Sequence, residues 1–177
     1  TVPSSTFSMI LDKYFDGDSD RSWAAKNYIV KYVKDLLNII EDRRIDYHVF
    51  NSAPGYKGYY HAMYDKYFNA KVIDKALASK EMRNLDWDSY MFRICNITNV
   101  NRDLKALPGL IDIWNVINLK NIQRLKYSSQ ALDVAFEVFN IVESYLPKPE
   151  PQDDCDGDGC DGNDNESDTN NGGCNGD

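Results

Sequence analysis

The chain has 177 residues, a net charge of −8 and 42% hydrophobic residues. Nearly all the apolar residues lie in about the first 146 positions, which is enough for one hydrophobic core. No apolar run is long enough to span a bilayer, and no signal peptide is recognisable, so we expect a cytoplasmic protein without a membrane partner. The negative charge argues against nucleic acid as a main partner, because phosphate binding requires clustered Lys and Arg.

The apolar residues recur at helical spacing along the chain, and no segment alternates as a strand does. Ser4 and Ser5 are predicted to cap a short helix that runs through Phe15. Asp18 or Ser19 then starts a long helix, which ends near Phe50 before a turn with Pro and Gly. The later predicted helices cover about residues 57–79, a segment from Asp86 that carries Tyr90, Ile94 and Ile97, residues 110–119 with Pro108 near the first turn, and residues 128–145 with Ser128 and Ser129 as caps.

These helices predict an all-α fold, a multi-helix bundle over residues 1–146. The long helix should be central and should touch both the tyrosine-rich helix and the last helix. Residues 147–177 are predicted to be a disordered, acidic low-complexity linker, because their composition cannot offset the entropy of ordering. The alternative for residues 154–165 is a weak calcium loop, although position twelve is Asn165 and not Glu.

The segment 38–46 places several acids and bases in the last part of the long, otherwise apolar helix. Glu41 falls on the same side of that helix as Ile45, so its carboxylate points towards apolar packing. A carboxylate there must be paired, bound to metal or protonated. One interpretation is an internal ion pair with Arg43 or Arg44, and the other is a functional carboxylate.

Residues 36–46, 53–59 and 64–68 carry a family resemblance. These runs resemble phage and bacterial proteins that are similar to the T subunit of cobalt chelatase and to nitric-oxide-reductase activation proteins. In that family a helical region precedes an acidic linker and a von Willebrand A-type domain. Many members also carry an H-E-x-x-H-like motif upstream of the helix. The resemblance is strong over about residues 30–80 and covers residues 80–177 only in general layout.

The resemblance implies a helical adaptor or interaction domain, joined by its acidic segment to a von Willebrand A-type domain. The implied partner is a protein such as a ring-forming ATPase, in the host cell cytoplasm if the protein is phage-encoded. The alternative is part of a zinc metallopeptidase in which Glu41 is the third zinc ligand and Asp42 and Asp46 orient a ligand. His48 and His61 do not form an H-E-x-x-H motif, so the zinc-binding histidines are expected upstream of this chain, which would be an internal piece of a longer protein. We expect the chain itself to have no cofactor and no catalytic activity.

Tyrosines are dense between Tyr56 and Tyr67. At helical spacing and with few basic neighbours, their rings are expected to pack in the core. The alternative is a ring surface that stacks on bases or sugars. His48 and His61 are expected to be ordinary polar residues, with a metal site as the alternative.

Overall fold

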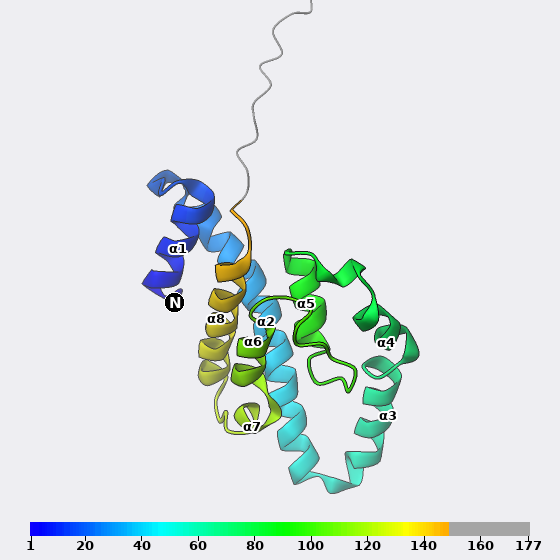
Figure 1. Cartoon of the computed structure of the whole chain (residues 1–177). Coiled ribbons are helices and arrows are strands. Elements are labelled where there is room, and N and C mark those ends of the chain that lie inside the picture. The colour runs from blue at the N-terminus through cyan, green and yellow to red at the C-terminus, as the bar shows by residue number, and fades with distance from the viewer. Residues whose placement is uncertain (149–177) are drawn as a thin grey trace, which may run out of the picture.

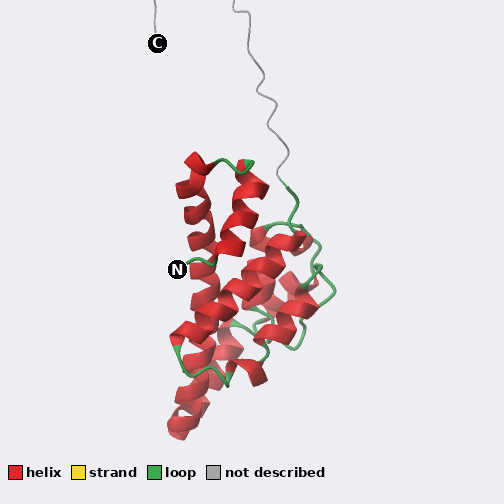
Figure 2. Ribbon diagram, turned by 90° about the vertical axis from the view of Figure 1, so that its left-hand side faces the viewer, coloured by secondary structure: helices red, strands yellow, loops and turns green. Residues whose placement is uncertain are grey.

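The computed structural model of the chain describes residues 1–148 and is helical throughout, without strands in that range (Figure 1; Figure 2). The α-helices are α1 (Ser4–Phe15), α2 (Ser22–Ser52), α3 (Lys57–Tyr67), α4 (Lys71–Ala78), α5 (Trp87–Cys95), α6 (Leu110–Ile117), α7 (Leu119–Ile122) and α8 (Ser128–Tyr145). Three 3-10 turns lie between them, η1 (Ser19–Arg21), η2 (Pro54–Tyr56) and η3 (Glu81–Arg83). The predicted all-α class is confirmed.

Helix α2 runs along the middle of the molecule, with α1, α6 and α8 on one side and α3, α4 and α5 on the other (Figure 1). Helix α8 packs along α2 more extensively than any other helix does. The buried residues of α2 and α8 recur at helical spacing and include Ala25, Ile29, Val33, Leu36 and Ile40 from α2 and Ala131, Ala135, Val138, Phe139 and Val142 from α8. The long helix is therefore central and touches the last helix, as predicted. It also touches the tyrosine-rich helix, through a hydrogen bond from Tyr64 to Asp46.

Gly109 sets the distance between α6 and α8. It precedes α6 with a positive φ of 75°, and a Cβ atom there would lie 2.5 Å from the ring of Tyr145. Only glycine combines this backbone conformation with so close a contact. The predicted first-turn proline, Pro108, therefore lies just outside the helix, and Gly109 occupies the N-cap position.

The predicted single helix over residues 57–79 is wrong, because the chain forms two helices there, α3 and α4. The backbone N–H groups of Phe68 and Asn69 both donate to the carbonyl oxygen of Tyr64, which ends α3. Ala70 is then extended, and α4 begins after it. The turn contains neither Gly nor Pro, so neither of the strongest helix-breaking residues marks the break. The new direction of the chain buries Leu77, whose carbonyl oxygen accepts hydrogen bonds from Arg93.

The last helix also starts differently from the prediction. Its N-cap residue is Tyr127, and the side-chain oxygen of Gln130 accepts hydrogen bonds from the backbone N–H groups of Lys126 and Tyr127 at 2.7 and 3.2 Å. The two serines thus lie in the first turn and not at the cap. Glutamine at this position reaches back to the helix start as in a capping box.

Two further sequence-based predictions concern membrane-spanning segments and the acidic linker. None of the helices within residues 1–148 is both long enough and apolar enough to cross a bilayer. The predicted acidic linker, residues 147–177, lies outside the described residues apart from Pro147 and Lys148, and so does the candidate calcium loop at 154–165.

The fold can be tested at the contact between α2 and α8. Phe139→Ala should lower the free energy of unfolding by about 3–5 kcal/mol, because Phe139 is fully buried in that contact. Val100→Ala is the matched control: this side chain is 86% exposed, so its loss should change stability by less than about 0.5 kcal/mol. Urea denaturation followed by circular dichroism measures both, and equal effects of the two substitutions would contradict this packing.

Candidate functional site

Glu41, the first candidate from the sequence, forms an ion pair within its own helix. Its Oε2 accepts hydrogen bonds from Nε and Nη2 of Arg44 at 2.9 and 2.7 Å. Burial raises the pKa of Glu41, but the hydrogen bond from Arg44, the nearby Ser128 hydroxyl and the charge of Arg44 together outweigh it and hold this pKa below its usual value. Its other oxygen, Oε1, is buried and has no hydrogen-bond partner among residues 1–148.

The other charged residues of the segment 38–46 point in different directions around α2. Asp42 is exposed to solvent. Asp46 accepts a hydrogen bond of 2.6 Å from the hydroxyl of Tyr64 on α3. Arg43 is buried and donates from Nη2 to the carbonyl oxygens of Ile94 and Cys95, both at 2.9 Å. The segment therefore does not bring Glu41, Asp42 and Asp46 together.

Two cavities open beside this part of α2. The larger, of about 410 Å³, is lined by the end of α2, by α3 and by Leu119, and includes Phe50, Tyr60 and His61. The smaller, of about 320 Å³, is lined by residues of α2, α3 and α5 that include Ile39, Met63 and Cys95. Four residues line both cavities: Arg43, Asp46, Tyr64 and Thr98. A mainly apolar hollow with a few polar groups is the usual form of a binding site.

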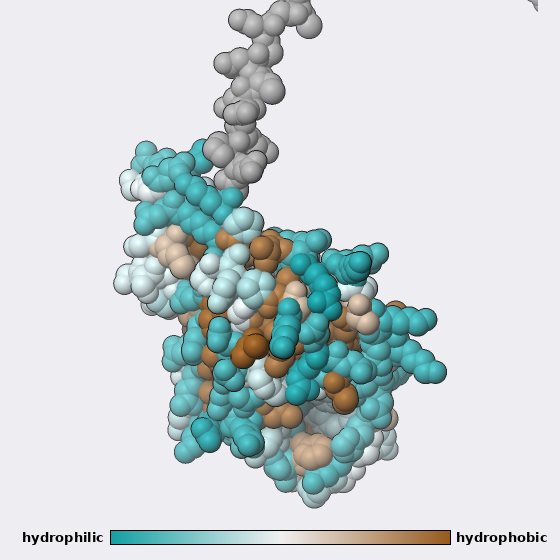
Figure 3. Space-filling view, in the orientation of Figure 1, coloured by the Kyte–Doolittle hydropathy of each residue, from teal (hydrophilic) through white to brown (hydrophobic). Residues whose placement is uncertain are grey.

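The outer side of α3 carries an exposed surface, which the sequence analysis gave only as the alternative to packing in the core. Tyr56, Tyr59, Met63 and Tyr67 follow one another at helical spacing and are all exposed, Tyr59 to 75%; we call them the aromatic face. Helix α3 has no buried residue at all. Pale and brown residues, of intermediate and high hydropathy, lie among hydrophilic ones at the lower end of the molecule, where α2 and α3 meet (Figure 3). The expectation that these rings pack in the core is therefore wrong for the aromatic face.

Burial shifts the pKa values of two groups that line both cavities, Tyr64 and Arg43. The pKa of the Tyr64 phenol is raised, first by desolvation and then by its hydrogen bond to Asp46. The pKa of the Arg43 guanidinium is lowered by desolvation. Shifted ionisable groups in a hollow are typical of functional sites, although structural networks also produce them.

The two histidines contact different residues. His48 Nε2 is 3.5 Å from the carbonyl oxygen of Leu125, while the His61 ring packs edge-on against Phe50 and lines the larger cavity. Within residues 1–148, no three His, Cys, Asp or Glu side chains are grouped so that they could hold a metal ion. The zinc role of Glu41 thus stays a prediction about a longer protein.

Glu143 is a buried polar residue that the sequence analysis missed. Its Oε1 accepts hydrogen bonds from Tyr28 and Trp87 at 2.7 and 3.0 Å, and its Oε2 accepts from Lys13 and Tyr14, both at 2.9 Å. The signal was present, because Glu143 lies four residues after Phe139 and falls on the buried stripe of the last helix.

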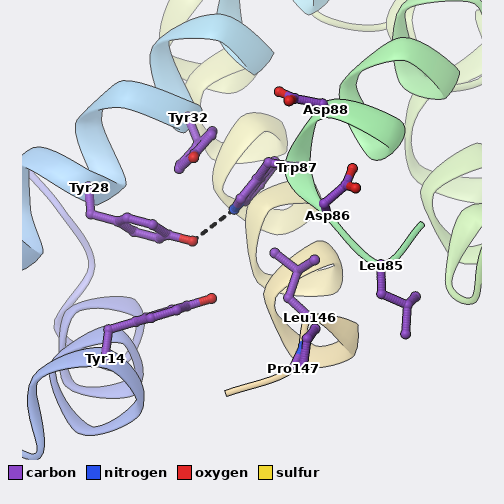
Figure 4. A pocket seen from close by; sticks show the side chains of 9 residues that line it. All are labelled: Tyr14, Tyr28, Tyr32, Leu85, Asp86, Trp87, Asp88, Leu146 and Pro147. Carbon is purple, nitrogen blue, oxygen red and sulfur yellow. Dashed lines mark hydrogen bonds between the residues drawn. The ribbon is translucent and has the colours of Figure 1, made fainter. Parts of the chain in front are cut away.

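Tyr14 and Tyr28 also line a third cavity of about 310 Å³ (Figure 4). Their hydroxyls converge there, Tyr28 accepts a hydrogen bond of 2.9 Å from the Trp87 indole, and the Tyr32 ring stacks on Trp87 with centroids 4.3 Å apart. All buried polar side-chain atoms of this network have partners, since the two exceptions in residues 1–148 are Glu41 Oε1 and Arg43 Nη1. The network is thus structural, and the candidate functional site is the pair of cavities around Arg43.

Comparison of the chain with protein-family models, with curated proteins and with solved structures finds no match. The function is therefore argued from the site.

The tyrosines of the Glu143 network predict loss of stability at high pH. Burial raises the pKa of Tyr14 and of Tyr28 above the ordinary value of 10.0, so the folded state keeps protons that the unfolded state loses. Stability should be at its full value below pH 10 and should then fall by up to about 1.4 kcal/mol per pH unit for each such tyrosine. Urea denaturation at a series of pH values measures this slope. The Tyr14→Phe/Tyr28→Phe double variant should have a shallower slope, and an unchanged slope would contradict the assignment.

Proposed function

We propose that this chain is a helical adaptor domain that binds a protein partner through the aromatic face and the cavities beside it. The observation that carries the proposal is the exposure of Tyr56, Tyr59, Met63 and Tyr67 on a helix without a buried residue. Tyrosine is enriched at protein interfaces, because its rigid ring buries much apolar area while its hydroxyl keeps a polar contact. Contiguous exposed apolar surface next to a hollow marks an interaction site more often than chance exposure.

The resemblance to cobalt-chelatase T-subunit-like proteins supports a specific setting for this adaptor. In that setting the acidic segment from residue 147 joins it to a von Willebrand A-type domain, and the partner is a ring-forming ATPase in the cytoplasm. The residues that carry the resemblance, 36–46, 53–59 and 64–68, include most of the lining of the smaller cavity but only Arg43, Asp46 and Tyr64 of the larger one. The setting and the candidate site thus concern the same part of the chain.

One observation favours the zinc alternative as a second candidate. Glu41 Oε1 is buried without a hydrogen-bond partner in residues 1–148, which leaves one carboxylate oxygen for a group from elsewhere. Two histidines one helical turn apart, supplied by a segment upstream, could complete a zinc site with it. Asp42 and Asp46 would have to change position to orient a zinc ligand. In the present structure Asp42 is exposed to solvent, and Asp46 accepts a hydrogen bond from Tyr64.

The zinc alternative has a clear test in the longer protein. Glu41→Gln should lower the zinc content after dialysis steeply if Glu41 is a ligand. If Glu41 only pairs with Arg44, the substitution should leave the metal content unchanged and cost about 1 kcal/mol of stability. Stoichiometric zinc retained by residues 1–146 alone would instead show that His48 and His61 hold metal without upstream residues.

The adaptor proposal is tested by cross-linking from the aromatic face. A photo-reactive phenylalanine analogue at position 59 or 67, in cells that make the protein naturally, should form a cross-link to one partner protein. The same analogue at position 23 is the control, because Trp23 is 76% exposed but lies at the far end of α2. Mass spectrometry of the product also shows whether the partner is a ring-forming ATPase. Equal cross-linking from position 23, or none from 59 and 67, would contradict the proposal.

A further inference from the structure

Arg43 is a buried cation without an acidic partner. The residue is only 8% exposed, and it takes part in none of the ion pairs within residues 1–148. Its Nη2 is held by two carbonyl oxygens at the end of α5, whereas its Nη1 is buried and has no hydrogen-bond partner in the same residues. Buried guanidinium groups are normally paired, because removing a charge from water is costly.

Deprotonation does not remove this cost. Desolvation lowers the pKa of Arg43, but the ordinary pKa of a guanidinium is so high that the group stays charged at physiological pH. The nearest candidate on its own helix face, Asp46, is engaged by the Tyr64 hydroxyl at 2.6 Å and forms no ion pair with Arg43. The positive charge is therefore fixed in position and forms no ion pair within residues 1–148.

Arg43 is buried but forms part of a cavity wall, so a group bound in the cavity would lie against its side chain. It lines both cavities beside α2, together with the hydroxyl-bearing Thr98 and Tyr64. The two carbonyl bonds fix the plane of the guanidinium, so its unpaired edge is oriented before any ligand arrives. Around it the larger cavity is lined by apolar side chains that include Phe50, Tyr60 and Leu119.

We infer that Arg43 binds a carboxylate side chain of the protein partner, carried on a segment with aromatic or aliphatic residues beside the acid. This inference rests on the proposed adaptor function and names the chemistry of the segment that it recognises. The acid completes the hydrogen bonding of Nη1, the neighbouring apolar residues fill the cavity, and the rest of the segment lies on the aromatic face.

The charges near Arg43 favour a carboxylate over a phosphate group. Asp46 lines both cavities and Asp42 lines the smaller one, so a doubly charged phosphate would meet two negative side chains. The guanidinium carries one positive charge and its buried Nη1 is unpaired in residues 1–148, which suits a single carboxylate with one negative charge. The exposed Tyr59 and Tyr67 extend the contact surface beyond the cavity, which suits a peptide segment.

Selection from a displayed library of random peptides tests the inference on the whole chain. Peptides that bind should be enriched in Asp or Glu flanked by aromatic or aliphatic residues. Replacing that acid with its amide, Asp→Asn or Glu→Gln in the peptide, should weaken binding to the unchanged protein by about tenfold or more, because charge-assisted hydrogen bonds are the stronger kind. Binding that changes less than about twofold would overturn the inference.

The matched protein variants are Arg43→Met and Arg44→Met. Both remove one guanidinium from neighbouring positions of α2, but Arg44 pairs with Glu41 and lines neither cavity. Arg43→Met should weaken the acid-bearing peptides about as much as the amide exchange does, and should not weaken the amide peptides further. Arg44→Met should leave both unchanged. Thermal unfolding of each variant checks that it is folded, and the amide exchange in the peptide provides a test even if Arg43→Met is not.

The outcomes separate this inference from the proposed function. In one outcome, the Tyr59→Ser/Tyr67→Ser variant of the protein loses peptide binding, whereas neither Arg43→Met nor the amide exchange in the peptide weakens it. That outcome would support the adaptor surface and overturn the carboxylate inference alone. Peptides indifferent to the tyrosine substitutions, or no binding peptides at all, would overturn the proposed function and this inference with it.

Discussion

The carboxylate of Glu143 is the polar centre on which the packing of four helices depends. It lies on α8 and accepts hydrogen bonds from Lys13 and Tyr14 on α1, Tyr28 on α2 and Trp87 on α5. A buried carboxylate is tolerated only where a counter-charge and several donors replace its hydration. Because these donors come from three other helices, satisfying one carboxylate fixes the relative positions of α1, α2, α5 and α8.

The same requirement is not met at the other end of α2. Each oxygen of Glu143 has two donors, whereas Arg43 Nη1 and Glu41 Oε1 are buried without partners in residues 1–148. Both exceptions fall within the segment 38–46 that stood out in the sequence. Helix α2 thus has two roles: its first half contributes apolar residues to the core, and its last part contributes polar groups whose hydrogen bonding is incomplete. This contrast is the physical basis for placing the functional site there and not beside Glu143.

The sequence predicted the helices well where the apolar periodicity is uninterrupted. The long helix and the last helix were found with small errors at their ends, since their apolar residues recur without interruption. The break between α3 and α4 was missed, because it depends on backbone hydrogen bonds of Phe68 and Asn69 and not on Gly or Pro. The tyrosines of the aromatic face were placed in the core by mistake. Helical spacing shows which residues share a side of a helix, but not whether another element covers that side.

The sequence by itself determined the all-α class and the apolar stripes of α2 and α8, and it offered the pairing of Glu41 with a neighbouring arginine as one of two interpretations. All of these depend on residues at most a few turns apart on one helix, for which local geometry is sufficient. Only the tertiary structure decided the environment of Glu143, whose partners are 56 to 130 residues away, and that of Arg43, which is held by carbonyl groups 51 and 52 residues away. These contacts follow from how the helices pack, and no local pattern in the chain encodes the distance between two helices.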